Sequence, residues 1–138
     1  MKVRLRVVTP AVVKVDEDAD MIIMRTTTGD MGVLFGHEAR SAVLNLGALR
    51  ILDSGNERRI AVYGGLATVK NNVLTILTND AEWPEEIDRV RAEANREHAE
   101  RRLQERTDDI EIREDLLMLR RALVQIEVSS YPYDDRSR

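Results

Sequence analysis

The sequence of 138 residues contains no cysteine, which excludes a disulfide framework, a thiolate metal site and a cysteine nucleophile. Its only histidines are His37 and His98, so no metal centre is expected. Its longest apolar runs are only a few residues, so direct insertion into a membrane is not expected. Its formal net charge of −4 gives no basic surface for nucleic acid.

The amino-acid composition of the chain changes near residue 80. All seven glycines lie at or before Gly65, and all three lysines lie in the same part of the chain. Residues 1–80 carry 10 basic and 9 acidic side chains, whereas residues 81–138 carry 11 and 16. This change in composition indicates two domains, over residues 1–83 and 84–138.

The first domain has the pattern of short β-strands. Val3, Leu5 and Val7 alternate with Arg4 and Arg6, a period of two that places one face of a strand in a core and the other in water. Similar segments recur at short spacing, which is typical of an all-β sandwich or a small barrel. The further segments expected to form strands are residues 12–15, 21–27, 32–34, 48–52, 59–63, 67–70 and 73–78.

Turn-forming residues separate these segments. Asn71 and Asn72 suit a tight hairpin, because asparagine tolerates positive φ angles. Gly64 and Gly65 lie between two predicted strands and precede no helix, so a turn or bulge is expected there and a phosphate-binding loop is not.

The second domain has the pattern of two helices. Pro84 suits the first position of a helix, and the segment over about 85–105 contains no glycine. Its few apolar side chains are mostly small and form a thin stripe. Thr107 and Asp108 supply a helix N-cap, and apolar residues at spacings of three and four then predict a second helix. These residues are Ile112, Leu116, Leu119, Leu123 and Ile126. An antiparallel two-helix hairpin following the β-domain is therefore predicted.

No set of residues in the sequence supports catalysis. One cluster nevertheless has binding chemistry, since Asp88 and Arg91 share a helix face that His98 and Arg121 can approach. A carboxylate can accept hydrogen bonds from a base or ribose, and a guanidinium matches phosphate oxygens. The alternative is an ordinary surface ion pair, which contributes only about 0.2–1 kcal/mol.

The order of a small sandwich and a helical hairpin resembles the epsilon subunit of bacterial F-type ATP synthases. Several short segments are similar to those of that family in order and spacing: residues 8–10, 29–34, 36–37, 47–51, 61–65 and 79–82. The resemblance implies a non-catalytic subunit of the central stalk, peripheral on the cytoplasmic face of the bacterial cell membrane. It requires no cofactor.

The resemblance also implies the partners of the β-domain. Asp30 is expected to face the c-ring, and the loop around His37 is expected to lie near the gamma subunit. The chain departs from the family pattern at Phe35, where proline is usual. Phe35 is either an interface anchor or a core residue at the end of the sandwich.

Residues 87–92 (Ile-Asp-Arg-Val-Arg-Ala) match a motif with which bacterial epsilon subunits bind ATP. The resemblance therefore implies ATP as a regulatory ligand, held by Glu82, Ile87, Asp88, Arg91, Ala92, His98 and Arg121. His98 and Gln125 stand where the family has arginines, so weaker ATP binding is expected.

The same resemblance implies that the hairpin has two states, one folded on the sandwich and one extended along gamma to inhibit ATP hydrolysis. In the extended state Arg113, Arg120 and Arg121 are expected to meet the catalytic alpha and beta subunits, unless they only form an exposed face. The alternatives to a rotor subunit are a free-standing nucleotide sensor and a protein-interaction adaptor.

Overall fold

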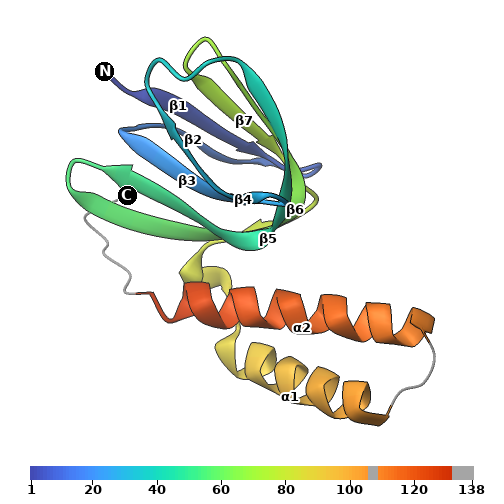
Figure 1. Cartoon of the computed structure of the whole chain (residues 1–138). Helices are drawn as coiled ribbons and strands as arrows, with labels where there is room; N and C mark the ends of the chain where they lie inside the picture. Colours follow the sequence, from blue (N-terminus) through green and yellow to red (C-terminus); the bar gives the residue numbers. More distant parts are fainter. Residues whose placement is uncertain (106–108, 132–138) are drawn as a thin grey trace.

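The structure is a computed structural model that describes residues 1–105 and 109–131. A curled β-sheet lies above two antiparallel helices (Figure 1). This arrangement confirms the predicted all-β sandwich with a following two-helix hairpin. The elements are β1 (Val3–Val8), β2 (Val13–Ala19), β3 (Met21–Thr26), β4 (Gly29–Leu34), β5 (Arg40–Asp53), β6 (Asn56–Lys70), β7 (Val73–Leu77), β8 (Ala81–Glu82), the 3-10 helix η1 (Pro84–Glu86), α1 (Arg89–Glu105) and α2 (Asp109–Ser129).

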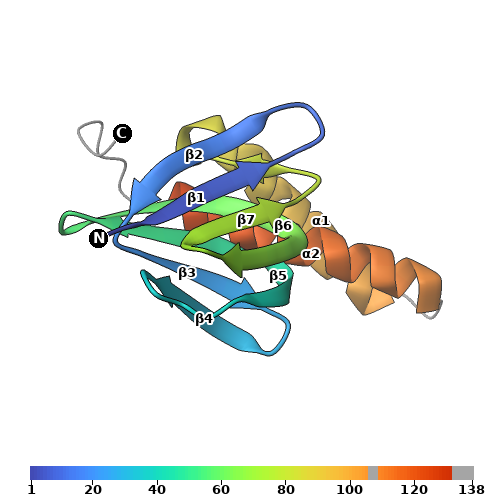
Figure 2. The same cartoon turned by 90° about the horizontal axis from the view of Figure 1, so that it is seen from above.

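The strands follow the order β2-β1-β7-β6-β5-β3-β4, and β8 pairs with β6. Strands β1 and β7 are parallel, whereas the other neighbouring strands are antiparallel. The two longest strands, β5 and β6, pair with each other from Arg40↔Val69 to Asp53↔Asn56. They form the middle of the sheet, which the view from above shows curled around its core (Figure 2).

The alternation in β1 has the predicted consequence. Val3, Leu5 and Val7 are fully buried, while Arg4 and Arg6 are exposed. The core between the two sides of the curled sheet consists of aliphatic side chains, because alternate positions of each strand point inward. Its largest fully buried members from the other strands are Ile22, Met24, Leu49, Ile51, Ile60, Leu74 and Ile76.

Two predictions about turns have different outcomes. Asn71 and Asn72 have φ angles of 51° and 61°, which confirms the tight turn. The turn expected at Gly64 and Gly65 is wrong, because β6 runs through both residues, although both have positive φ angles within the strand. Gly65 has a φ of +130°, and a Cβ there would lie 2.2 Å from the Leu77 carbonyl oxygen, so neighbouring backbone fills the space of a side chain.

The predicted start of the first helix is also wrong. Pro84 begins only the short η1, and the backbone becomes extended at Ile87 before α1 begins at Arg89. Asp88 then caps α1, because its Oδ1 accepts a hydrogen bond of 3.1 Å from the backbone N–H of Arg91. The extended residue allows Ile87 to enter the contact between hairpin and sandwich. The predicted cap of the second helix, Thr107 and Asp108, lies outside the described residues.

The second helix is confirmed, but its predicted apolar face is partly wrong. Leu116 and Leu123 are exposed, at 38% and 47%. The buried apolar residues of α2 are instead Ala122, Val124 and Val128. The sandwich presents Ala48 and Ala61 where α2 packs against it, and the short side chains of Val124 and Val128 fill this contact. Two of the leucines predicted to be buried lie outside it.

Candidate functional site

A polar cavity of about 390 Å³ lies where the hairpin meets the end of the sandwich. Strand β8, helix η1, the start of α1 and the second half of α2 all contribute to it. The lining residues are Glu82, Glu86, Asp88, Arg91, Ala92, Asn95, Arg121 and Gln125. Since both domains form its walls, a molecule bound there would contact the sandwich exit and both helices at once.

The α1 side of the cavity follows from the capped start of that helix. Asp88 holds the first turn, and Arg91, Ala92 and Asn95 follow at positions that share a helix face. Ala92 is only 1% exposed, so α1 and α2 approach closely beside the cavity. Arg91 is exposed and makes no ion pair within residues 1–105 and 109–131, which leaves its guanidinium available to a ligand.

Glu82 is the most densely contacted carboxylate of the cavity. Its Oε1 accepts hydrogen bonds from the Tyr63 hydroxyl at 2.6 Å and from the Gln125 amide at 3.2 Å. Burial, followed by the hydrogen bond to Glu82, raises the pKa of the Tyr63 hydroxyl above its ordinary value, so the hydroxyl remains a donor.

Arg121 reaches the same group from α2. Its Nη2 lies 2.8 Å from Asp80 Oδ2 and 3.8 Å from Glu82 Oε1. Its guanidinium also lies over the Tyr63 ring, 3.8 Å from the ring centre. The sandwich therefore already supplies charged and aromatic partners for this arginine.

The charges of the cavity limit what it can bind. Three carboxylates, from Glu82, Glu86 and Asp88, face two guanidinium groups, from Arg91 and Arg121. The acids and the two amides suit a hydroxyl-rich or amide-bearing group such as a nucleoside, and the arginines suit an anion. Of the two arginines that line the cavity, only Arg91 has no carboxylate partner among residues 1–105 and 109–131, so an anion with several charges would meet one guanidinium without such a partner.

The structure brings together five of the residues that the sequence assigned to an ATP site: Glu82, Asp88, Arg91, Ala92 and Arg121. Ile87 lies beneath the cavity in the apolar contact between the domains. His98 is exposed and does not line the cavity, although it lies one turn beyond Asn95 on α1. The assignment of these residues to ATP stays a prediction.

Sequence reasoning missed Glu86, Asn95 and Tyr63. Asn95 is four residues after Arg91, so helical spacing alone places it on the same face. Tyr63 gave no such signal, because it is 19 residues from Glu82 and reaches it only through the pairing of β6 with β8.

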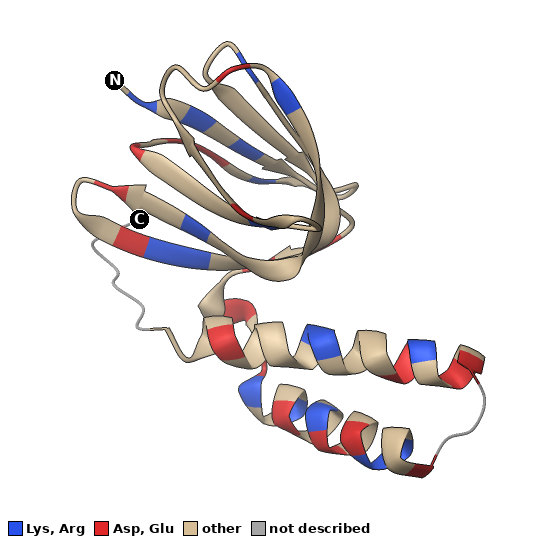
Figure 3. Cartoon of the chain, viewed as in Figure 1, with Lys and Arg blue, Asp and Glu red and all other residues tan. Residues whose placement is uncertain are grey.

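The apolar contact between hairpin and sandwich is small. It consists of Ala48, Ala61, Ile87, Val124 and Val128, with Leu46 and Tyr63 packed at its border. Two of the five buried residues are alanines. Charged residues of both signs occur along both helices (Figure 3).

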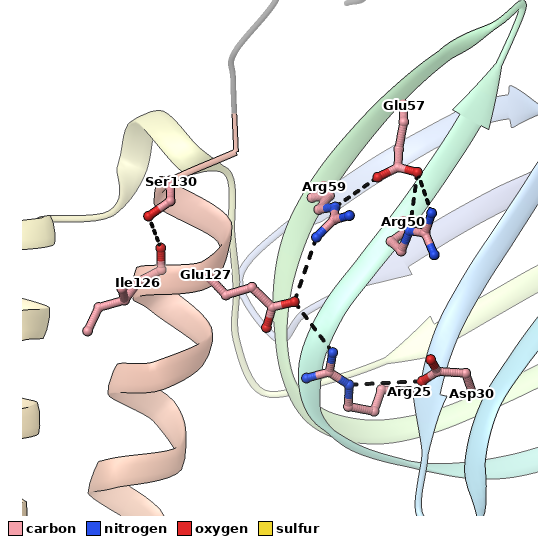
Figure 4. A network of polar contacts seen from close by, with 8 residues as sticks. All are labelled: Arg25, Asp30, Arg50, Glu57, Arg59, Ile126, Glu127 and Ser130. Carbon is pink, nitrogen blue, oxygen red and sulfur yellow. Dashed lines mark hydrogen bonds and ion pairs between the residues drawn. The ribbon is translucent and has the colours of Figure 1, made fainter.

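A polar network joins the end of α2 to the sandwich (Figure 4). Glu127 Oε1 lies 3.5 Å from a nitrogen of Arg25 and 3.7 Å from a nitrogen of Arg59. Arg59 is in turn bound to Glu57 at 2.8 Å. Gly47 makes room for Arg25, because a Cβ at position 47 would lie 2.8 Å from its Cδ.

The residues predicted to contact partners lie apart from the cavity. Asp30 belongs to β4 and not to a loop, and its carboxylate is 4.0 Å from Arg25. Phe35 is 44% exposed just beyond the other end of β4, so it is not a core residue. His37 follows it, with its Nδ1 2.7 Å from the Glu38 carbonyl oxygen.

On the hairpin, Arg113 and Arg120 are exposed on α2 and make no ion pair in the described part of the chain. Among the described residues, no group of three or more histidine, cysteine or acidic side chains could hold a metal ion. Neither α1 nor α2, as described, is both long enough and apolar enough to cross a membrane.

A row of apolar residues, all exposed except the half-buried Val8, crosses five strands of the sandwich. The register places Val43 beside Leu66, Leu66 beside Leu77, Leu77 beside Val8, and Val8 beside Val13. Val43 and Leu77 are 56% and 52% exposed. A hollow of about 530 Å³, lined in part by Val8, Leu66 and Leu77, adjoins the row. Such a continuous apolar surface is typical of a contact with another protein.

Comparisons with known proteins cover both domains. Residues 2–84 match the beta-sandwich domain of ATP synthase delta/epsilon chains, and residues 85–130 match the long alpha-helix domain of those chains. The chain is 39% identical over 127 residues to the ATP synthase epsilon chain of Bacillus velezensis, covering 92% of this chain and 96% of that protein. It is 38% identical over 125 residues to the epsilon chain of Caldicellulosiruptor bescii, covering 91% of each. Its fold matches a chain of the Euglena gracilis mitochondrial ATP synthase with a TM-score of 0.80 and 27% identity, covering 91% of this chain and 79% of that one.

Proposed function

This chain belongs to the ATP synthase delta/epsilon family, and from that premise we propose that it regulates the enzyme as a non-catalytic subunit of the central stalk. It is an epsilon chain of an F-type ATP synthase, as its relatives and its match to a chain of an assembly of OSCP, F1 and c-ring support. The subunit carries no reaction of its own. It couples the catalytic head to ion translocation and limits ATP hydrolysis.

The sandwich is the part that joins the rotor partners. The apolar row from Val43 to Val13 supports contact with the gamma subunit, because it is continuous and mostly exposed. Asp30 faces the c-ring, and the Phe35–His37 segment lies nearer gamma. Asp30 lies near the start of β4 and Phe35 just beyond its end, which agrees with two different partners. The subunit is thus peripheral, on the cytoplasmic face of the bacterial cell membrane.

The hairpin is the regulatory part. Folded on the sandwich, it leaves rotation free; extended along gamma, it meets the catalytic alpha and beta subunits through Arg113 and Arg120 and blocks hydrolysis. The small apolar contact beneath it supports this proposal, because little buried area must be exposed when the hairpin detaches.

The single observation that carries the regulatory proposal is that both domains form the walls of one cavity. ATP bound there would contact Glu82 of the sandwich, Arg91 of α1 and Arg121 of α2 together. Those contacts exist only in the folded state, so binding would favour that state by the difference in affinity between the two states.

The experiment is the capture of gamma by the full chain, followed by measurement of ATP hydrolysis in the reconstituted enzyme. We expect Leu66→Asp to abolish gamma capture, because it places a charge in the apolar row. Leu117→Asp on α2 is the matched control, since Leu117 is 56% exposed outside the row, and it should retain capture. Equal capture by both variants would contradict the proposed surface.

Two other functions predict different results. A free-standing nucleotide sensor would bind ATP but would not capture gamma, and an adaptor would do neither of these while binding another protein. Calorimetry of the isolated chain with ATP separates the sensor from the adaptor. In that titration, Arg91→Ala should weaken the ATP signal and Arg101→Ala, outside the cavity, should leave it unchanged.

A further inference from the structure

Glu82 receives donors from two domains at the same oxygen atom. The Tyr63 hydroxyl comes from β6 in the sandwich, and the Gln125 amide comes from α2, at 2.6 Å and 3.2 Å. The donors lie in separate parts of the fold, so they meet at Glu82 only while the hairpin is folded on the sandwich.

Arg121 strengthens the same junction one helical turn before Gln125. It pairs with Asp80 at 2.8 Å and lies over the ring of Tyr63. Tyr63 therefore contacts the hairpin in two ways, through Arg121 above its ring and through the carboxylate that its hydroxyl shares with Gln125. The side chain also packs against the apolar contact between the domains.

All these contacts join side chains of this chain. Glu82 and Arg121 would be expected to bind a nucleotide, yet here each has partners within the chain. Hydrogen bonds to charged groups are stronger than those between neutral groups, and they gain further strength where water is partly excluded.

We propose that Tyr63, Glu82, Arg121 and Gln125, named here the Tyr63 cluster, hold the hairpin on the sandwich without a bound nucleotide. This inference rests on the proposed two states of the hairpin. Side chains of this chain then stabilise the folded state of the hairpin. The folded state depends less on ATP than it would if the arginines of the cavity had no partners within the chain.

The test is hydrogen exchange of the full chain in the absence of nucleotide, read separately for α2 and for the core strands β1 and β7. Amide protection reports the population of the detached state even when it is rare. In Arg121→Gln, which removes the charge that pairs with Asp80 and lies over the Tyr63 ring, α2 should lose about tenfold in protection, because an ion pair and a cation–π contact between the two domains are both lost. Protection of β1 and β7 should not change.

Gln125→Glu tests the same cluster from the exposed helix, because it replaces a donor to Glu82 with a repelling carboxylate. It should also lower α2 protection, because the hydrogen bond between the domains is lost and two carboxylates then face each other. Gln104→Glu is the matched control, since Gln104 is exposed on α1 outside the cavity, and it should leave α2 protection unchanged.

Val128→Asp separates this inference from its premise. Val128 is fully buried in the apolar contact, so a charge there should detach the hairpin whether or not the Tyr63 cluster contributes to its attachment. If Val128→Asp lowers α2 protection but Arg121→Gln and Gln125→Glu do not, the role of the cluster is overturned. If none of the three affects α2, the hairpin does not detach, and the two-state proposal itself is wrong.

Discussion

The sandwich core and the contact beneath the hairpin are built in different ways. The core gathers large aliphatic side chains from both sides of a curled sheet, among them Leu5, Ile22 and Leu74, each fully buried. The contact beneath the hairpin has two alanines among its five buried residues and is bordered by ion pairs and hydrogen bonds.

This difference matters energetically. Burying a leucine or isoleucine contributes roughly 1.5–3 kcal/mol, and an alanine contributes much less. Partly exposed ion pairs add about 0–1 kcal/mol each. One chain therefore contains a domain that is held together by burial and an arm whose attachment is weaker and depends on specific polar groups.

The hairpin itself continues this pattern. Ala92 and Ala99 are buried between the helices, and Asp115 of α2, only 3% exposed, lies 3.3 Å from Arg102 of α1. Close approach of small residues and an ion pair that is buried on the Asp115 side fix how the helices pair, with little apolar area. The pairing of the two helices therefore also depends on small residues and specific polar groups.

The largest effect is expected from Gly65→Ala in the sandwich. A methyl group there would collide with the Leu77 carbonyl oxygen, and the φ of +130° is unfavourable for alanine. The free energy of unfolding should fall by roughly 3–5 kcal/mol, measured by urea denaturation. Gly29→Ala is the control, because Gly29 has a φ of +123° and nothing within 4 Å of its added Cβ. It should cost only about 1 kcal/mol, and equal losses would mean that the collision is unimportant.

A smaller effect, confined to the arm, is expected from Val128→Asp. The buried carboxylate should cost more than about 2 kcal/mol of docking free energy while the sandwich stays folded. The measure is urea denaturation followed at both domains, which should show a separate early transition for the helices. Leu117→Asp introduces the same residue at an exposed site and should keep a single transition. Loss of both domains together in Val128→Asp would contradict the distinction between core and arm.

The smallest effect is expected from Glu57→Gln in the polar network. The hydrogen bond from Arg50, followed by that from Arg59, lowers the pKa of Glu57 below its ordinary value of 4.5. A lowered pKa in the folded state means that the charged form stabilises the fold above pH 4.5 and that this gain is lost as the pH falls through the folded value.

Wild type should therefore exceed Glu57→Gln by about 1 kcal/mol at pH 7, and the difference should shrink below pH 4.5. Urea denaturation at the two pH values measures it. A difference that is the same at pH 7 and pH 3.5 would show that the charge of Glu57 does not stabilise the fold.

Much of the fold could be predicted from local pattern. The alternation of Val3, Leu5 and Val7 predicted which face of β1 is buried, and the two asparagines predicted a turn with positive φ angles. The turn expected at Gly64 and Gly65 is wrong, because glycine is found both in turns and where another strand approaches closely. Only the pairing of β6 with β7 shows that the second reason applies at Gly65.

The sequence predicted only part of the cavity, because local spacing identifies residues on one helix face and does not show how two helices cross. Asp88, Arg91 and Ala92 share one helix face and one motif, so spacing identified them. Whether His98 faces the cavity depends on where α2 crosses α1, which no local pattern contains, and the structure leaves it exposed outside.

The sequence by itself determined the division into a glycine-rich β-domain and a charged, glycine-free hairpin, because turn residues and hydrophobic period act over a few residues. Only the tertiary structure decided which face of α2 is buried, since Ala48 and Ala61 provide the small surface that Val124 and Val128 fill. The tertiary structure also places the Tyr63 hydroxyl beside the Glu82 carboxylate, and it places both side chains in contact with α2. Contacts between residues 19 and 43 positions apart depend on strand register and domain docking, and these follow from the packing of the whole chain.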